Sequence, residues 1–138
     1  MGDINQPKRI VLIDDFAPWR QSIAAILLRR AETEVVGEAA DGLEAVQKVQ
    51  ELKPDLILLD VGLPGIDGLE VARRVKRLML GTRIIFLSHC SEAEIVNAAL
   101  SDGAEGYVLK TDAGNELLKA IAVVLSGEQY VSRRVSAF

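Results

Sequence analysis

The sequence predicts an α/β fold in which a five-stranded parallel sheet carries helices on both faces. Short apolar runs alternate along the chain with longer segments of helical periodicity, as expected when each strand is followed by a helix. Two of the runs, at positions 56–59 and 84–87, are apolar at every residue, as in strands buried on both faces. Connections between parallel strands cross over a face of the sheet, so this order of elements implies a covered sheet.

Five strand–helix pairs follow one another without an internal repeat. Pro54 closes the connection after the second helix. The last helix is capped by Thr111 and Asp112 and runs to Ser126, where Gly127 ends it. The predicted strands are at 9–13, 34–39, 55–59, 82–88 and 106–109, and the first four helices at 16–30, 42–52, 68–79 and 92–101.

Length and composition indicate one globular domain. The chain has 138 residues, of which 49% are apolar, and this suffices for a sizeable core. The net charge of −4 argues against nucleic-acid binding by this chain itself, which would need a basic surface. The single cysteine, Cys90, excludes an intramolecular disulfide, and no segment resembles a secretion signal or a membrane span. We therefore expect a cytoplasmic protein that does not contact membranes.

Three carboxylates directly follow two of the apolar runs. Asp14 and Asp15 end the first predicted strand, and Asp60 ends the third. Ligands bind at the carboxyl ends of the strands in such sheets, so we expect these three side chains to lie together there. Their mutual repulsion would be relieved by Mg²⁺, a hard cation that prefers oxygen ligands.

Two further polar residues fall at the same edge of the predicted sheet. Lys110 ends the fifth strand and supplies a fixed positive charge, and Ser88 ends the fourth and supplies a hydroxyl group. Together they can hold the oxygens of a phosphoryl group. Carboxylates accept phosphoryl groups covalently, and Asp60 is followed at once by a turn that leaves it open to attack. These residues predict a phosphate-accepting signalling switch with Asp60 as the acceptor.

Five segments, in this order and spacing, resemble the receiver domain of bacterial two-component response regulators. The resemblance covers roughly residues 9–126 and implies the flavodoxin-like (βα)5 fold known as CheY-like. Residues 102–110 are most similar to the NarL/FixJ subfamily, whose members carry a LuxR-type helix-turn-helix DNA-binding domain after the receiver. The domains implied are a tail at 1–8, a receiver at 9–126, and at 127–138 the start of a linker to an effector domain outside this sequence. The matching segments are 11–15, 55–60, 63–68, 86–88 and 106–110.

The resemblance also implies roles for the acidic residues. Asp60 would accept a phosphoryl group from a sensor histidine kinase. Asp15 and Asp60 would bind Mg²⁺ directly, together with the carbonyl group of Gly62, and Asp14 would bind it through water. Receivers promote their own phosphorylation and slow dephosphorylation and are not otherwise enzymes. Binding to DNA would occur only through the effector domain.

Three residues on the last two strands would carry the response. The resemblance implies that Lys110 pairs with the phosphoryl group. Ser88 would turn toward that group on activation, and Tyr107 would move inward with it. Such a change is a two-state switch biased by a new local charge.

Some positions around the predicted site depart from the family's usual pattern. His89 stands where the family usually has a small residue that admits the phosphoryl group. Gly62 and Cys90 occupy positions that line the site and tune dephosphorylation in the family, and Pro64 also lines it. Thr111 follows Lys110 in place of the proline that many receivers carry.

Other interpretations of these residues are open. Asp14 and Asp15 could cap a helix, and Tyr107 could be an ordinary strand aromatic with its hydroxyl in water. A Mg²⁺-dependent phosphohydrolase would need a second acid two residues after the nucleophile, where Gly62 stands. The main alternative function is a phosphorylation-independent receiver that acts as a docking module.

The first and last helices carry more apolar residues than contact with a sheet requires. Positions 23–28 and 120–125 are each six apolar residues in a row. A helix packed on a sheet needs an apolar stripe only about 100° wide. The surplus predicts an outer apolar face and hence a homodimer through these two helices, unless small alanines merely lie at the surface.

Overall fold

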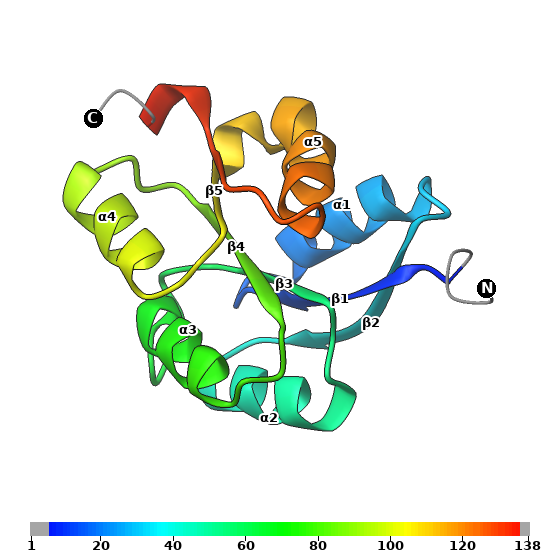
Figure 1. The fold of residues 1–138 in the computed structure, drawn as a ribbon, viewed down its shortest axis with the longest axis horizontal. Coiled ribbons are helices and arrows are strands. Elements are labelled where there is room, and N and C mark those ends of the chain that lie inside the picture. The colour runs from blue at the N-terminus through cyan, green and yellow to red at the C-terminus, as the bar shows by residue number, and fades with distance from the viewer. Residues whose placement is uncertain (1–5, 136–138) are drawn as a thin grey trace.

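The computed structural model describes residues 6–135, which form three layers (Figure 1). The sheet is the middle layer, with two helices on one face and three on the other. Residues 1–5 of the predicted tail and 136–138 of the predicted linker lie outside the described residues. The strands are β1 (Lys8–Ile13), β2 (Thr33–Ala39), β3 (Leu56–Leu59), β4 (Arg83–Ser88), β5 (Gly106–Leu109) and β6 (Tyr130–Val131). The helices are α1 (Ala17–Leu28), α2 (Gly42–Leu52), α3 (Gly68–Arg77), α4 (Ala93–Ser101) and α5 (Ala113–Leu125), with 3₁₀ turns η2 (Lys110–Asp112) and η3 (Arg133–Val135).

The strands lie in the order β2-β1-β3-β4-β5-β6, and each neighbouring pair is parallel. The predicted parallel sheet with helices on both faces is therefore confirmed. The described sheet has six strands instead of five, because β6 adds to the free edge of β5. The strand order reverses between β1 and β3, and a crevice for ligands forms at such a reversal, outside the carboxyl ends of the strands.

Two separate cores hold the layers together. Successive side chains of a strand point to opposite faces, so Ile57 and Ile84 pack with α2, α3 and α4. Their chain neighbours Leu56 and Ile85 pack on the other face with α1 and α5. All four side chains are fully buried, which explains why the runs 56–59 and 84–87 are apolar at every position.

Helix starts follow the capping chemistry of the sequence in two cases and depart from it in a third. The carboxylate of Asp41 accepts the Glu44 N–H at 2.8 Å at the start of α2, and Asp67 accepts the Glu70 N–H at 2.9 Å at the start of α3. Asp112 precedes α5 but makes no side-chain capping bond. The prediction that Asp112 caps this helix is wrong, because its carboxylate turns to Arg134, with Oδ1 and Nε 3.4 Å apart.

The segment after α5 packs along β5. The Ser132 N–H donates to the carbonyl of Tyr107 at 2.8 Å, and the Ser132 hydroxyl accepts the Leu109 N–H at 3.0 Å. Val135 follows and is buried in the core beside α4. Residues 130–135 therefore cover an edge that would otherwise expose unpaired backbone groups. Within the part of the chain that the structure describes, no helix is long and apolar enough to span a membrane.

Candidate functional site

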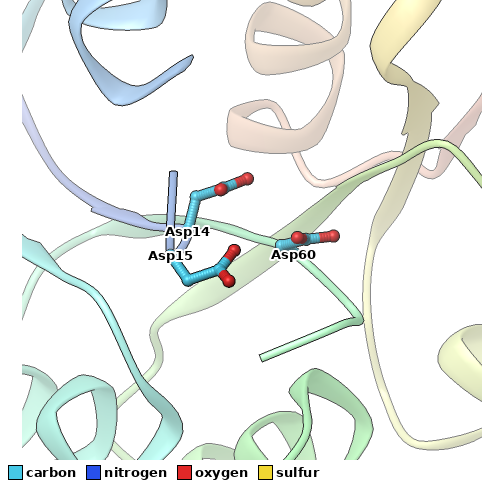
Figure 2. Close-up of side chains that lie close together, drawn as sticks. All are labelled: Asp14, Asp15 and Asp60. Atoms are coloured by element: carbon cyan, nitrogen blue, oxygen red, sulfur yellow. The ribbon is translucent and has the colours of Figure 1, made fainter. Parts of the chain in front are cut away.

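The ends of two neighbouring strands bring three carboxylates together. Asp14 follows the last residue of β1, Asp60 follows the last residue of β3, and these last residues, Ile13 and Leu59, are partners in the parallel ladder. Each of Asp14, Asp15 and Asp60 offers a carboxylate oxygen within 4.8 Å of the other two. Figure 2 shows Asp14 and Asp15 leaving one chain segment and Asp60 leaving the next. The predicted cluster therefore forms at the reversal of the strand order.

Backbone hydrogen bonds fix the positions of these acids. The Asp14 N–H donates to the carbonyl of Ala39 at 3.0 Å, and the Asp60 N–H donates to that of Ile13 at 3.0 Å. The Asp14 carboxylate also accepts the Phe16 N–H at 2.9 Å and is almost fully buried. The alternative of a helix cap for Asp14 is wrong, because Phe16 is the N-cap residue of α1 and no side chain caps this helix, and the Asp14 bond instead forms the turn that precedes it. Asp15 is exposed.

Lys110 lies against the two less exposed acids. Its Nζ is 2.6 Å from Oδ2 of Asp14 and 3.4 Å from Oδ2 of Asp60, and only 8% of its side chain is exposed. Burial raises the pKa of the Asp60 carboxyl above its ordinary value, and the negative charge of Asp14 adds to the rise. The ammonium group of Lys110 opposes both effects. Asp60 is thus a carboxylate in a partly dry pocket with a fixed cation beside it.

The donor set of the cluster fits a hard divalent cation. Its ligand atoms are carboxylate oxygens, the type that Mg²⁺ prefers. Three carboxylates carry −3 and Lys110 carries +1, so a formal charge of −2 is left to be balanced. Beside the cluster Gly62 is exposed, and a side chain there would meet no atom within 4 Å. The site therefore has the charge and the ligand type for a divalent ion, and no side chain at position 62 narrows the access to it.

Ser88 and Tyr107 are connected through the loop that follows β4. The Ser88 hydroxyl accepts the Cys90 N–H at 3.0 Å, and the Tyr107 hydroxyl donates to the Cys90 carbonyl at 2.6 Å. Tyr107 is fully buried and Phe86 lies beside it, with ring centroids 6.1 Å apart. The interpretation of Tyr107 as a strand aromatic with its hydroxyl in water is therefore wrong. Its hydroxyl is bound by the loop after β4, which begins at the same end of the sheet as the acid cluster.

The other residues predicted to line the site, His89, Cys90 and Pro64, are exposed or only half-buried. His89 is exposed, and Cys90 is half-buried with its thiol 3.8 Å from a carboxylate oxygen of Glu92. Pro64 is also exposed, and its carbonyl accepts the Gly42 N–H at 3.4 Å. Pro64 therefore connects the loop after β3 to the start of α2.

The comparison with protein families covers the strands and loops that carry this site. The model described as the response regulator receiver domain matches residues 10–122. The chain belongs to the response regulator receiver family. In this receiver domain, the three acids and Lys110 come together as their positions at the ends of the strands predicted.

Similar proteins place the receiver in a subfamily. The nitrate/nitrite response regulator protein NarL of Escherichia coli K12 is 36% identical over 131 residues, which cover 95% of this chain and 61% of NarL. The oxygen regulatory protein NreC of Staphylococcus aureus strain JH9 is 39% identical over 129 residues, 93% of this chain and 59% of NreC. The predicted similarity to the NarL subfamily is confirmed, and the receiver spans about three-fifths of the length of these relatives.

A solved structure with the same fold was obtained with a phosphate mimic. The isolated receiver domain of RcsB from Salmonella enterica serovar Typhimurium, in the presence of the phosphomimetic BeF3−, is 27% identical to this chain. The two share a TM-score of 0.88, with 94% of this chain and 96% of that chain covered. The CheY-like receiver fold predicted from the sequence is confirmed at this level of similarity.

Two residues of α1 take part in the receiver's site without having been predicted to do so. The indole ring of Trp19 has its centroid 5.2 Å from Nζ of Lys110. Arg20 donates to the backbone carbonyl of Asp14 and pairs with Glu38 at 2.7 Å. The available signal was their position in the first turn of α1, which begins only two residues after Asp15.

The two tyrosines of the receiver give a prediction for alkaline pH. Burial raises the pKa of Tyr107, and burial together with a hydrogen bond to Glu116 raises the pKa of Tyr130 to about 12. Their neutral forms stabilise the fold fully below pH ~10. For Tyr130 this contribution is lost as the pH rises toward about 12, and for Tyr107 it is lost above the ordinary pKa of a tyrosine. We expect the tyrosinate absorbance of the folded protein to rise at higher pH than that of the unfolded chain.

The measurement is absorbance at the tyrosinate band during a pH titration, with circular dichroism to follow folding. The same chain in urea is the control, and both of its tyrosines should titrate near pH ~10. A full two-tyrosine step near that pH in the folded chain would contradict the prediction.

Proposed function

We propose that this chain receives a phosphoryl group on Asp60 and changes its conformation in response. The observation that carries the proposal is the pairing of a partly buried carboxylate with Lys110, 3.4 Å away, inside a cluster of two more carboxylates. The structural similarity to a receiver solved with a phosphomimetic supports it. The docking-module alternative is not favoured, because the acids and the lysine are all present and assembled.

The chemistry required of Asp60 is a single displacement. A carboxylate oxygen of Asp60 attacks the phosphorus of a phosphohistidine on a sensor kinase, and a P–O bond forms as the P–N bond breaks. The electron pair of the P–N bond stays on that histidine nitrogen, and the imidazole leaves in its neutral form because its other ring nitrogen carries a proton. Water later attacks the acyl phosphate and releases inorganic phosphate, which returns Asp60 to its carboxylate form. Lys110 supplies a fixed positive charge beside the oxygens of the transferred group.

Mg²⁺ is the proposed cofactor. Asp15 and Asp60 would hold it directly with the carbonyl of Gly62, and Asp14 would hold it through water. When bound, the ion neutralises negative charge on the phosphoryl oxygens. In its absence the acids repel one another and rely on Lys110 alone for compensation.

We expect Asp15→Asn to separate the stability of the fold from the function of the site. Asp15 is exposed and adds negative charge to two neighbours, so its neutralisation should raise the free energy of unfolding by about 0.5 kcal/mol without Mg²⁺. The stabilisation that excess Mg²⁺ gives the wild type should largely disappear. Urea unfolding with and without Mg²⁺ measures both. Glu34→Gln on β2, which removes an exposed carboxylate away from the cluster, should keep the Mg²⁺ response.

The switch would use the Ser88–Cys90–Tyr107 contacts. A phosphoryl group on Asp60 would compete for the Ser88 hydroxyl, which now accepts the Cys90 N–H. A shift of that loop would reach Tyr107 through the Cys90 carbonyl. Phosphorylation of Asp60 would in this way change the conformation of β5 and of the residues that pack along it.

The experiment that tests the proposal is intact-mass measurement after incubation with acetyl phosphate. We expect a gain of one phosphoryl group that requires Mg²⁺ and is absent in Asp60→Asn. Asp55→Asn is the matched control, because Asp55 precedes β3 at the opposite end of the strand. Failure to label the chain with acetyl phosphate and with a phosphorylated kinase would refute the proposal.

The partners of the whole protein follow from its subfamily. We infer a sensor histidine kinase as the phosphoryl donor, a cytoplasmic location, and a linker starting in residues 127–138 that leads to a DNA-binding effector domain. The receiver domain would occupy residues 9–126. The described part of the linker, up to residue 135, is packed on β5, so an effector domain would be attached close to the switch.

A homodimer through α1 and α5 is the proposed assembly. Both helices lie on the same face of the sheet (Figure 1). A groove of about 580 Å³ beside α5 is lined by apolar residues of that helix and by charged residues at its rim, among them Leu118, Leu125, Lys8, Arg30, Glu32 and Lys119. Leu28 on α1 is 88% exposed. We expect light scattering on a dilution series with a phosphate mimic to show dimers, and Leu28→Asp to weaken them. Monomers alone at every concentration, with and without the mimic, would exclude this assembly.

A further inference from the structure

Trp19 covers the ammonium group of Lys110 from the side of α1. Nζ of Lys110 lies 5.2 Å from the centroid of the indole ring, within the range of a cation–π attraction. Trp19 is half-buried and packs against the core between the sheet, α1 and α5. Apolar packing against this core therefore helps to hold the indole ring beside Lys110.

Lys110 has a longer and intrinsically more flexible side chain than the carboxylates it contacts at the site. It is a flexible four-carbon chain with a point charge, and holding it in one place costs rotamer entropy. Two carboxylates compete for its ammonium group, with Asp14 at 2.6 Å and Asp60 at 3.4 Å. In this arrangement the shorter bond is to Asp14, so ion pairing alone draws the charge toward Asp14 and not toward Asp60.

The indole face supplies an attraction of a different kind. It is spread over the ring and uses none of the three N–H donors, so the ammonium group can move between Asp14 and Asp60 without leaving the ring. We propose that Trp19 is a positioning residue that confines the Lys110 ammonium to the space between these two carboxylates. The proposal rests on the phosphoacceptor function of Asp60, for which Lys110 must reach the phosphoryl oxygens.

The alternative is that Trp19 only fills space between α1 and the sheet. The two possibilities differ in what a phenylalanine does at this position. Trp19→Phe keeps an aromatic face, whereas Trp19→Leu keeps apolar volume without one. If Trp19 is only structural, both substitutions change the stability of the protein and nothing else. If Trp19 positions Lys110, Trp19→Phe should keep part of the attraction for the Lys110 ammonium group and Trp19→Leu should lose it.

The contact itself is measured on the unphosphorylated protein by NMR. The indole ring current should shift the ε-methylene protons of Lys110, and Lys110→Met identifies their signal by removing it. Trp19→Leu should abolish the shift, and Trp19→Phe should retain part of it. Phe16→Leu is the matched control, because Phe16 is the neighbouring aromatic residue and 61% exposed. An unshifted Lys110 signal in the wild type would overturn the proposal.

The effect of Trp19 on the reaction of Asp60 is measured as the rate of phosphorylation by acetyl phosphate at saturating Mg²⁺. We expect Trp19→Leu to be slower than the wild type by roughly 2-fold to 30-fold, with Trp19→Phe in between and Phe16→Leu unchanged. Urea unfolding of each variant confirms that the folded fraction is equal in the rate measurement. A Trp19→Leu chain that loses the NMR shift but reacts at the wild-type rate would overturn only the role of Trp19. A wild type that is never phosphorylated would overturn the phosphoacceptor function as well.

Discussion

We expect Lys110→Met to lower the free energy of unfolding by about 3 to 5 kcal/mol in the absence of divalent ions. Lys110 and Asp14 form an ion pair whose side chains are 8% and 5% exposed, and Asp60 lies next to it. Methionine preserves most of the apolar stem but removes the charge. It therefore leaves two neighbouring carboxylates without their cation in a partly dry pocket, and this uncompensated charge causes the loss.

Urea unfolding of a double-mutant cycle tests this explanation. Asp14→Asn combined with Lys110→Met removes both charges of the buried pair, and it should recover much of the stability that the single Lys110 substitution loses. Excess Mg²⁺ should also restore part of it, because a divalent ion can balance the same carboxylates. A Lys110→Met chain as stable as the wild type without Mg²⁺ would show that the pair does not support the fold.

Gly68→Ala should lower the free energy of unfolding by about 3 kcal/mol and weaken Mg²⁺ binding at the same time. A methyl group at position 68 would lie 2.0 Å from the carbonyl oxygen of Asp60 and 2.8 Å from Cα of Val61. Both contacts are to backbone, which cannot turn away as a flexible side chain could. The Gly68 N–H also donates to the carbonyl of Val61 at 2.7 Å, so α3 begins in direct contact with the segment that carries Asp60.

Gly114→Ala is the matched control for this substitution. Gly114 lies in α5, and a methyl group there would meet no atom within 4 Å. This change should stabilise the protein by about 0.5 to 1 kcal/mol, because alanine favours the helix. Urea unfolding gives the stabilities, and calorimetric titration with Mg²⁺ gives the affinities. Equal Mg²⁺ affinity in Gly68→Ala and the wild type would mean that the loop after β3 absorbs the clash without moving Asp60.

The fold and the acid cluster could be predicted because both follow from local patterns, namely the apolar runs and the polar residues that directly follow them. Continuous apolar runs identify strands that are buried on both faces, and the acids follow those runs directly. Asp14, Asp15 and Asp60 come together because β1 and β3 are parallel neighbours. The same reasoning brought Lys110 to the site from the end of β5.

Other features could not be predicted from local patterns. Strand β6 has only two residues, Tyr130 and Val131, which is too short for a period to be recognised. Its pairing depends on the free edge of β5 and on the hydroxyl of Ser132. The same packing turned Asp112 toward Arg134 and away from the predicted helix cap.

The sequence by itself determined the order of strands and helices, the parallel sheet, and the set of residues that end the strands. These follow from periodicity and from the chemistry of single side chains, which neighbouring residues are enough to define. Only the tertiary structure decided that Tyr107 is buried with its hydroxyl on the loop after β4, and that Trp19 covers Lys110. Such contacts join elements far apart in the chain, and close packing of helices on both faces of the sheet determines which side chains meet.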